Sequence, residues 1–525
     1  MSIAAGYDLT NTAIFTGVVV SQGIEINQHT SSKLVVEITD KAMAMTLDRK
    51  NAVFANVTDS SLMTTLIGNY SLNSSVSSTS TTYEDIVQYY ATDWDLLVMR
   101  AELNGFVVIA DSGKVTVAQP ETSAEPVLLV AYGDSILDLD AQMNAATQFT
   151  SSAIKSSAWD DATQKVLESG PSSVDVTVPG NVSSEELAKT FDIQTLAQQS
   201  AGLIPTDGLQ DWSTAELLKS RLSKIRGQVR FQGSALARTG CMIELGGLGD
   251  RFNGSAFVSG VYHKITGGRW TTTATFGLAY AWFASEAANV AAPPAGGQLP
   301  PIQGLQTGIV QQVATDDAGE YRVKITLPLL GESCDGVWAR LGTFYASNQF
   351  GAVFFPEVAD EVVVGFMNND PRYPVILGSV YSKTLPPSNP PNESNDIKAI
   401  VTRSKLQITF DDANKILTIS TPGKRVICLD DNAGKITVSD DFKNSITMSS
   451  DGITIDSSKD LVLKAAASVT VTAGTTLSMT AAQDSSLSAM GISNTATGSF
   501  QAQGATASLE ASGITSISGA MVNIN

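Results

Sequence analysis

The segment SKDLVLKAAASVTVTAGTTLSMTA, residues 458–481, alternates apolar residues with small polar ones and contains no aromatic side chain. Such alternation is typical of β-strands that bury one face. After residue 460 the only charged residues are Lys464, Asp484 and Glu510. A core between two ordinary sheets would be short of large side chains here, so the segment is expected to fold in another way.

Strand-like segments of this kind recur through the region at short intervals. They are LQITF, ILTIS, KITVS, SITMS, GITID, DLVLK, SVTVT, TLSMT and SLSAM. One such strand buries one or two Val-sized side chains at ~1.5–3 kcal/mol each, which does not offset an ordering cost of ~1–2 kcal/mol per residue. Stability therefore has to come from stacking, and rungs this short favour a prism in which several chains each supply a face. The apolar residues predicted to face the core of that prism are Ile436, Ile446, Ile455, Val462, Val471, Met479 and Leu487.

The composition of the whole chain limits the classes of function. The chain has 525 residues, 43% of them hydrophobic and 16% charged, with a formal net charge of -19. This length favours about two to four domains, each large enough to bury a core. Because the chain is acidic, free nucleic acid and anionic membranes are poor partners, and no nucleic-acid partner is predicted.

No segment predicts a membrane span or a secretory leader. The apolar run at residues 126–133 is far below the ~18 residues of a spanning helix, and the first residues lack a basic start and an apolar core. We therefore expect synthesis in the cytoplasm. The cysteines Cys241, Cys334 and Cys428 are scattered without paired spacing and are predicted to be reduced.

Two stretches rich in Pro, Gly and Asn divide the chain. They are VAAPPAGGQLPP at residues 290–301 and LPPSNPPNESND at residues 385–396, whose composition disfavours helices and central strands. The predicted organisation is a first domain at 1–289, a linker at 290–303, a second domain at 304–384, a linker at 385–403 and a third domain at 404–525.

The first domain is predicted to be α+β. Alternation predicts strands in IFTGVVVSQGIEINQ and SSKLVVEITD, and again over residues 227–277. EDIVQYYATDWDLLVMRAELNG has Ile86, Tyr90, Leu97 and Ala101 at helical spacing before a Gly stop. Helices are also predicted in SSEELAKTFDIQTLAQQSAGL and STAELLKSRLSKIRG, and a hairpin with a DSG turn in GFVVIADSGKVTVAQ.

The second domain is predicted to be all-β. TGIVQQVATDDAGEYRVKITLP predicts two strands and a turn at residues 316–319, with Tyr321, Val323 and Ile325 on one face of the second strand. Further strands are predicted in GVWARLGTF, GAVFFPEV, DEVVVGFM and YPVILGSVY. About five or six short strands in ~80 residues favour a small barrel.

No catalytic, cofactor or metal site is predicted. The only histidines are His29 and His263, and neither a His-Glu-x-x-His nor a Cys-x-x-Cys motif occurs. GGLGDRFNG at residues 246–254 lacks the Lys-Ser/Thr of a phosphate-binding loop and is interpreted as a turn. Acidic pairs such as Asp138 and Asp140 are interpreted as turns or solvated faces.

The second domain resembles the OB-fold of the valine-glycine-repeat (VgrG) spike proteins and of the central spikes of contractile phages. The family pattern is a Tyr-Gly-Arg-Val-like strand, Trp-Val/Ala-Arg, Gly-x-x-Phe-x-Pro, Gln/Asp-Glu-Val-x-Val-x-Phe, Asp-Pro-x-x-Pro and Gly-x-Val-Tyr. In this chain these elements fall on residues 321–323, 338–340, 351–356, 360–366, 370–374 and 378–381. One departure is that Arg322 follows Tyr321 directly, where the family commonly has a Gly between.

Weaker similarity extends into the first domain. YYATDWDLLVMRAELNGFVV and LGDRFNGSAFVSGVYHKITGGRWTTTATFGL resemble the hub that forms a trimeric, pseudo-sixfold platform in this family. The resemblance implies a mainly β, multidomain fold. It consists of an α+β hub with two β-barrel subdomains and helices, a small OB-fold barrel, and a C-terminal trimeric intertwined β-helix or prism.

The resemblance also implies a function. It implies a homotrimeric spike and hub of a contractile injection system, which adapts a sixfold inner tube to a threefold needle and pierces a target envelope when the sheath contracts. Implied partners are the inner tube protein, baseplate proteins, effector or toxin cargo, and a tip protein of the proline-alanine-alanine-arginine (PAAR) type. Exposed strand edges at the blunt end predict that Val522, Ile524 and Asn525 bind that tip protein.

The resemblance implies neither an enzyme activity nor a cofactor, and no fused lysozyme or effector domain is expected. The protein is expected to be assembled into an injection particle after synthesis in the bacterial cytoplasm, and to be delivered or released outside the cell. Cell-anchored secretion systems, released particles and phages all remain open as the machine.

Two other functions fit a repetitive β-region. A β-helical polysaccharide lyase or hydrolase requires a cleft with carboxylates or Lys/Arg, and the near absence of charge after residue 461 argues against it. A receptor-binding tail fibre requires a globular tip domain after the repeats, and none is expected. Both alternatives predict a different C-terminal surface from that of a smooth needle.

Overall fold

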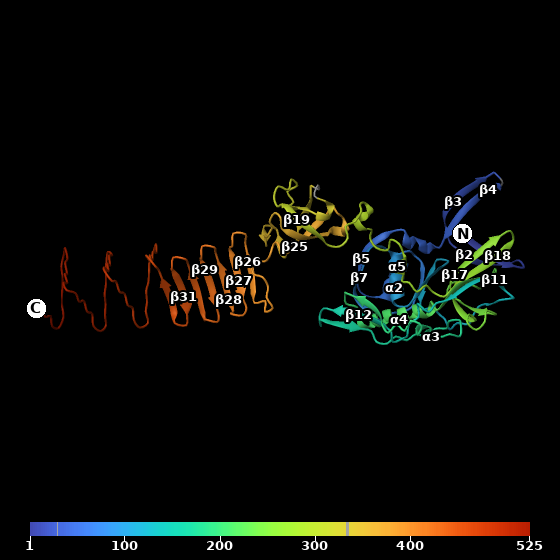
Figure 1. Ribbon diagram of the computed structural model, residues 1–525, viewed down its shortest axis with the longest axis horizontal. Helices are drawn as coiled ribbons and strands as arrows, with labels where there is room; N and C mark the ends of the chain where they lie inside the picture. Colours follow the sequence, from blue (N-terminus) through green and yellow to red (C-terminus); the bar gives the residue numbers. More distant parts are fainter. Residues whose placement is uncertain (29, 332–334, 525) are drawn as a thin grey trace. The chain divides into compact units, whose positions relative to one another are not determined.

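The computed structural model describes residues 1–28, 30–331 and 335–524. The chain divides into two compact units, Met1–Ser382 and Lys383–Asn525, which are described separately (Figure 1). β-strands are the main regular elements of both units, as the sequence predicts. His29, Cys334 and Asn525, which the sequence analysis names, lie outside the described part of the chain.

The first unit begins with antiparallel ribbons around a pair of helices. The strands are β1 (Ser2–Tyr7), β2 (Thr10–Thr16), β3 (Val18–Asn27), β4 (Thr30–Thr39), β5 (Arg49–Thr58), β6 (Asn73–Val76), β7 (Thr82–Thr92), β8 (Val107–Asp111) and β9 (Lys114–Ala118), and the helices are η1 (Lys41–Thr46), α1 (Asp59–Gly68) and α2 (Asp93–Leu103). β1 pairs with β2, β3 with β4 and β5 with β7, while β6, β9 and β8 form a three-stranded sheet. Met45, Met63 and Leu97 are buried where η1, α1 and α2 meet.

A six-stranded sheet follows, in the order β10-β16-β17-β18-β15-β11. Its strands are β10 (Leu129–Ala131), β11 (Ile136–Met143), β15 (Ile225–Gln232), β16 (Met242–Gly246), β17 (Gly254–Thr266) and β18 (Arg269–Phe276). A smaller sheet contains β12 (Ile154–Asp160), β13 (Lys165–Glu168) and β14 (Leu196–Ser200), and the helices are α3 (Ser184–Ala188), α4 (Thr206–Leu222), α5 (Phe283–Glu286) and η2 (Pro294–Gly297). Val229, Val258 and Phe276 lie in the core of the large sheet. The GGLGDRFNG segment connects β16 to β17 as a turn, as interpreted from the sequence.

The prediction of one helix around residues 84–105 is correct only for the second half of the segment. Ile86 and Tyr90 lie in β7, which pairs with β5 over most of its length, and only Leu97 and Ala101 are in α2. The helix begins after Thr92, whose side chain accepts a hydrogen bond from the Asp95 backbone at 3.0 Å. Long-range strand pairing therefore overrides the helical spacing in the first half of the segment.

The other two predicted helices also differ in their bounds. In SSEELAKTFDIQTLAQQSAGL the helix α3 ends at Ala188, and Leu196–Ser200 is strand β14, parallel to β12. The helix predicted in STAELLKSRLSKIRG is confirmed as α4, but it begins at Thr206, with Pro205 as its N-cap, and the final Ile-Arg-Gly belongs to β15. Ser213, the first residue of the predicted segment, therefore lies inside the helix, and Pro205 offers no side-chain cap.

The predicted hairpin is confirmed. β8 and β9 pair from Asp111 with Lys114, so Ser112 and Gly113 form a two-residue turn. Both have positive φ, 56° and 82°, which is the backbone that such turns require. Asn and Gly adopt this backbone most easily, and Gly113 supplies one of the two positions.

Five strands close into a barrel, as predicted for the second domain. They are β19 (Gln306–Gln312), β20 (Val323–Thr326), β21 (Val337–Leu341), β24 (Glu361–Phe366) and β25 (Pro374–Ser379), with β22 (Ala346–Ser347), β23 (Phe350–Gly351), η3 (Pro328–Leu330) and η4 (Met367–Asn369) in the connections. Val323, Ile325 and Ile376 are fully buried inside it. The barrel interior is tightly packed at Gly308. A Cβ atom at this position would lie only 2.9 Å from Val364 Cγ2, so a side chain there would force a neighbour to move.

Two details of the barrel prediction are wrong. Tyr321 does not share a face with Val323 and Ile325, because it precedes β20 with a φ of 56° and is 83% exposed. GAVFFPEV is not a full strand, since only Phe350–Gly351 pairs, with β22. The exposed aromatic residues of that segment are therefore outside the barrel core.

The second unit contains a seven-stranded antiparallel meander, in chain order (Figure 1). The strands are β26 (Ile397–Val401), β27 (Gln407–Asp411), β28 (Ile416–Ser420), β29 (Val426–Asp430), β30 (Lys435–Ser439), β31 (Ser445–Ser449) and β32 (Gly452–Asp456). Each strand has five residues and pairs with the next in regular register. Every strand therefore presents the same positions to the same face.

Candidate functional site

One face of the C-terminal sheet is made of two continuous columns of aliphatic side chains. Neighbouring strands pair these residues directly opposite each other, so each column runs across all seven strands. The first column is Ile400, Ile408, Ile419, Ile427, Val438, Ile446 and Ile455. The second is Phe410, Leu417, Leu429, Ile436, Met448 and Ile453, with Lys398 at its start.

The opposite face is polar. Its central column is Ala399, Thr409, Thr418, Cys428, Thr437, Thr447 and Thr454. Threonine is favoured on a solvated strand surface because its branched side chain fits the pleat and its hydroxyl remains hydrated. Ile397, Val401, Ile416 and Val426 also lie on this face, at the ends of their strands. Its central column has no large aliphatic side chain, so the other face is the one that most requires a cover.

The aliphatic face is largely uncovered in the single chain. Ile446 is 39% exposed and Ile455 is 52% exposed, whereas core residues of the first unit are almost completely buried. A contiguous apolar face of this extent marks a protein–protein contact surface. We call the two columns together the aliphatic face.

Three of the predicted prism-core residues lie on this face. Ile436 is in the second column, and Ile446 and Ile455 are in the first. The other members of the face are not among the predicted core residues. The alternation of segments such as LQITF and ILTIS could have identified them, because residues two apart in a strand lie on the same face. Their role in a trimer core remains a prediction.

The described residues after β32 behave differently from the sheet. Strands were expected in DLVLK, SVTVT, TLSMT and SLSAM, but none is assigned between residues 457 and 524. No backbone hydrogen bond joins residues 461–524 to another described residue. The reason is geometric: these stretches are extended but have no strand beside them in the same chain, and Figure 1 shows them as a repeated zigzag.

The zigzag has a regular period. Bends occur at residues 458, 466, 474, 482, 490, 497, 505, 512 and 520. Val471, Met479 and Leu487 each lie five residues after a bend, whereas Val462 lies four residues after one. Leu463 occupies the position equivalent to the other three, so Val462 is one residue out of register with them. All of these residues are exposed in the single chain.

The predicted tip residues are exposed as well. Val522 is 47% exposed and Ile524 is 86% exposed, while Asn525 lies outside the described residues. Both described residues have large apolar side chains at the end of an extended segment without backbone partners. This end is therefore able to add strands or side-chain contacts from another protein.

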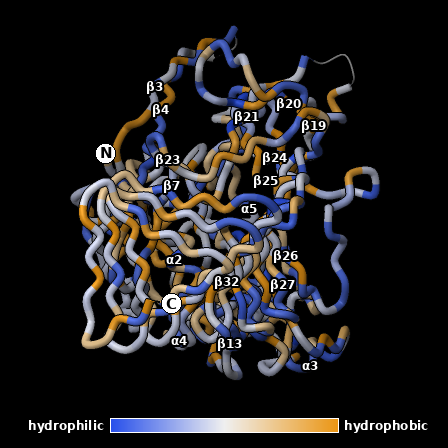
Figure 2. The backbone as a smooth tube through the Cα atoms, turned by 90° about the vertical axis from the view of Figure 1, so that its left-hand side faces the viewer, coloured by the Kyte–Doolittle hydropathy of each residue, from blue (hydrophilic) through white to orange (hydrophobic). Residues whose placement is uncertain are grey.

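A second uncovered apolar surface lies in the first unit, on the hairpin of β3 and β4. Ile24 is opposite Leu34 and Gln22 is opposite Val36, so Ile24, Leu34 and Val36 share one face. Ile24 and Leu34 are 70% and 72% exposed. Figure 2 shows apolar stretches of the tube along this hairpin, which extends from the rest of the unit in Figure 1. An isolated two-stranded hairpin is marginally stable in water, so this one is suited to a partner.

The helices of the first unit are fixed by buried ion pairs. Arg100 donates from Nε and Nη2 to the two carboxylate oxygens of Asp59, at 2.6 and 2.9 Å, and Asn104 donates to the same carboxylate at 2.8 Å. Lys50 donates to Asp93 at 2.8 Å, and this hydrogen bond raises the pKa of Lys50. These charges are satisfied within the fold, so they join α1 and α2 to the sheet rather than form a reactive site.

The residues considered as candidates for a reactive site make contacts that stabilise the fold. His263 Nδ1 is 2.9 Å from Thr272 Oγ1 on the paired strand and accepts a hydrogen bond from the Trp270 indole at 3.3 Å. Burial lowers the pKa of His263. Asp138 forms an ion pair with Arg230 on the neighbouring strand β15. Within residues 1–28, 30–331 and 335–524, no group of three or more His, Cys, Asp or Glu is placed to hold a metal ion.

Among the described residues, no helix combines the length and the apolar character needed to cross a bilayer. Cys241 and Cys428 are free thiols, and each is partly buried.

Three family models match successive parts of the chain. Residues 1–267 match the Alg8 N-terminal domain, residues 306–381 the type VI secretion system/phage-baseplate injector OB domain, and residues 415–483 the phage baseplate V C-terminal trimerisation domain. The last segment contains the aliphatic face from β28 onward and the first bends of the zigzag.

Individual relatives are similar over shorter stretches. The type VI secretion system spike protein VgrG5 of Pseudomonas aeruginosa is 28% identical over 114 residues, which are 20% of this chain and 14% of that protein. The actin cross-linking toxin VgrG1 of Vibrio cholerae is 33% identical over 81 residues, 15% of this chain and 7% of that protein. The matches thus span about one-seventh or less of these relatives.

A solved structure also resembles the chain. The c3393 protein of E. coli, a type VI secretion component described as similar to the bacteriophage T4 tail proteins gp27 and gp5, has a TM-score of 0.34 and 14% identity. The alignment covers 72% of this chain and 86% of that one.

Proposed function

The chain belongs to the family defined by the Alg8 N-terminal domain and carries the injector OB and trimerisation domains of VgrG-like spike proteins, and on this basis we propose that three copies form the spike and hub of a contractile injection machine. The aliphatic face carries the proposal. It is the part of the chain that most clearly requires other copies, and from β28 onward it falls within the trimerisation match.

In the proposed trimer the three aliphatic faces form the core of a prism. Each chain contributes one side, with the threonine columns on the outside in water. Neighbouring strands lie ~4.8 Å apart, so the columns extend the core continuously along the axis. After β32 the three chains wind around one another. Each extended stretch then pairs with strands of the other two chains.

The first domain, residues 1–289, acts as the hub. We propose that it adapts the sixfold inner tube to the threefold needle and contacts the baseplate. The uncovered face of the β3–β4 hairpin, with Ile24 and Leu34, supports contacts of this kind because it requires a covering protein. The buried Asp59–Arg100 pair supports a rigid platform.

The last residues act as the tip. We propose that Val522, Ile524 and Asn525 bind a PAAR-type cap, and that the capped needle pierces a target envelope and carries effector cargo when the sheath contracts. The names of curated relatives support this setting, since one is a spike protein and another a toxin. Removal of residues 522–525 is expected to weaken cap binding and leave the trimer intact, and loss of the trimer as well would contradict this assignment.

The action proposed is mechanical, with no catalytic step by this chain. The protein is made in the bacterial cytoplasm, assembled into the particle, and delivered or released outside the cell. This mechanical action requires a rigid needle. A smooth shaft of small residues after residue 465 also suits passage through an envelope.

The proposal is tested by molar mass. Light scattering on the purified full chain and on a fragment from Leu385 to Asn525 is expected to give three chains for both, stable in mild detergent. A monomeric fragment would contradict the shared prism and would favour a solenoid formed by one chain. A trimeric fragment with a monomeric full chain would contradict the proposed hub.

A further inference from the structure

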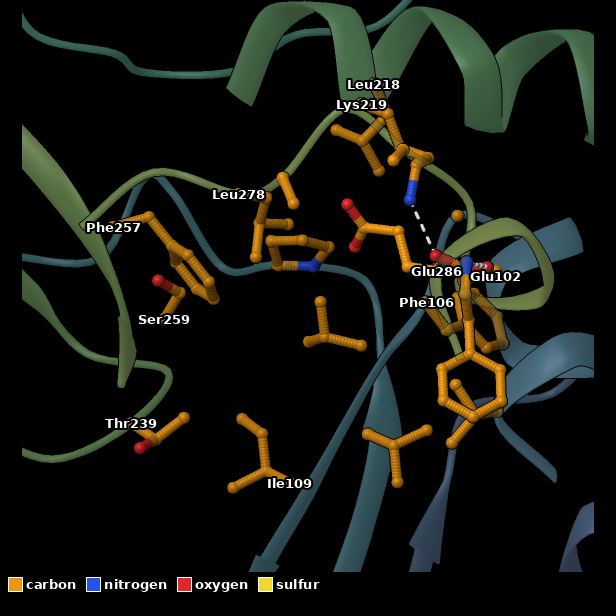
Figure 3. A pocket seen from close by; sticks show the side chains of 18 of the residues that line it. Glu102, Phe106, Ile109, Leu218, Lys219, Thr239, Phe257, Ser259, Leu278 and Glu286 are labelled. Atoms are coloured by element: carbon orange, nitrogen blue, oxygen red, sulfur yellow. Dashed lines mark hydrogen bonds and ion pairs between the residues drawn. The ribbon is translucent and has the colours of Figure 1, made fainter. Parts of the chain in front are cut away.

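The first unit contains a cavity of about 400 Å³ that no part of the spike function uses (Figure 3). It lies between α2, β8, α4, β17 and the segment that ends in α5. Its apolar lining includes Trp94, Val98, Phe106, Phe257, Leu278 and Phe283. This volume and lining are typical of sites for small ligands or single side chains.

One end of the cavity is lined by an ion pair whose two charges neutralise each other. Lys219 Nζ lies 2.6 Å from Glu102 Oε1, and the backbone N–H of Phe283 donates to Glu102 Oε2 at 2.8 Å. Lys219 also lies over the Trp282 ring, 5.1 Å from its centre. Both oxygens of Glu102 and the Lys219 charge are thus already engaged within the fold.

A second carboxylate at the cavity remains available. Glu286, the last residue of α5, lines the cavity, and Figure 3 shows its carboxylate turned toward Leu278. It is exposed and has no hydrogen bond or ion pair with the described residues. Because Lys219 is paired with Glu102, Glu286 gives the cavity a net negative charge.

We propose that this cavity binds a ligand with an apolar body and one cationic amino head. The body replaces water against Phe106, Phe257 and Leu278, and the head pairs with Glu286. Aromatic rings in the lining add favourable contact with a cation. Such a ligand is presented by a lysine beside an apolar residue on a partner protein, or by a free alkylamine. The proposal does not depend on the proposed spike function.

The test uses saturation-transfer NMR on the full-length protein with hexylammonium as the probe. Hexanoate is the matched control, because it has a similar apolar body and the opposite charge. We expect saturation transfer to hexylammonium and none to hexanoate. Equal signals for the two probes, or no signal for hexylammonium, would overturn the proposal.

Variants locate the site. Glu286→Gln is expected to weaken hexylammonium binding about fivefold, the effect of one partly exposed charge pair. Glu125→Gln, at an exposed glutamate away from the cavity, is expected to change nothing. Ala281→Phe, which fills the cavity, is expected to abolish binding. Unchanged binding in Glu286→Gln would overturn the proposal, and this variant removes no side-chain hydrogen bond or ion pair among the described residues.

Two peptides distinguish the sources of the ligand. Competition by acetyl-Leu-Lys-Leu-amide, but not by acetyl-Leu-Glu-Leu-amide, would assign the site to a lysine of a partner segment. Binding of hexylammonium without competition by the lysine peptide would assign it to a small amine. Competition by both peptides would show that the charge of the head is irrelevant and would contradict the proposal.

Discussion

Ile427 of β29 and Val438 of β30 lie directly opposite each other, and in the single chain each keeps about two-fifths of its surface exposed, 41% and 40%. The pair lies in the middle of the first aliphatic column. Two well-packed β-branched residues would ordinarily be buried in a sheet that has a covering layer. The exposure of this pair is one example of why we expect other copies of the chain to cover this face.

A charge in this column is expected to break the trimer. Val438→Asp removes an apolar side chain worth ~1.5–3 kcal/mol when buried and brings three carboxylates together near the axis. We expect a monomeric or unfolded C-terminal unit by light scattering. Thr437→Asp is the matched control, because its side chain is on the opposite face of the same strand. A trimer in both variants would contradict the assignment of the faces.

The register of the zigzag gives a second prediction. Leu463 is equivalent to Val471 by the spacing of the bends, and Val462 is one residue out of register. Leu463→Asp is therefore expected to lower the thermal stability of the assembly strongly, and Val462→Asp only weakly. Circular dichroism melting of the two variants distinguishes them. The reverse order would support Val462 as the core position, as the sequence predicts.

The buried carboxylate of Asp59 predicts a large effect in the hub. Arg100→Ala leaves a charge with 1% exposure without its bidentate partner, and is expected to lower the free energy of unfolding by ~3–5 kcal/mol. Arg238→Ala removes a pair whose two side chains are both 51% exposed, and is expected to cost at most ~1 kcal/mol. Denaturant unfolding measures both, and equal costs would contradict the structural role of the buried pair.

Acid is expected to weaken the turn before β20. The Arg322 side chain donates to Asp316 and lowers the pKa of that carboxyl below its usual value. A lowered folded-state pKa contributes stability above the unfolded-state value of ~3.9, and this contribution is lost as the pH falls toward the folded-state pKa. Asp316→Asn is expected to show a smaller loss of barrel stability below about pH 4. The measurement is the melting temperature as a function of pH, and an unchanged profile would contradict the assignment.

The barrel and the aliphatic face could be predicted from local pattern. Alternation in VKIT and EVVVGF places Val323 and Val364 inside the barrel, because the period of a strand is two whatever its partners are. The same period identified Ile436 and Ile446. Turn chemistry succeeded at Gly113 for the same reason, since a two-residue turn depends on its own backbone.

The predictions that were wrong concern features that depend on residues distant in the sequence. Ile86 and Tyr90 fit a helical spacing, yet Ile86 pairs with Phe54 of β5 and Tyr90 lies at an irregularity of β7 with a φ of 46°, and no local signal reports this. Tyr321 fits an alternation, yet the chain turns there with positive φ. The cavity lining also could not be predicted, because Trp94, Phe257 and Phe283 meet only after the sheets and helices assemble.

Amide hydrogen exchange on residues 457–524 of the full-length protein tests the central claim most directly. Residues 461–524 have no backbone hydrogen bond to another described residue of the same chain, so any protection there has to come from other chains. The account predicts slow exchange through residues 461–487, comparable with that of β28–β31. Exchange as fast as in an unfolded peptide would contradict an intertwined trimer.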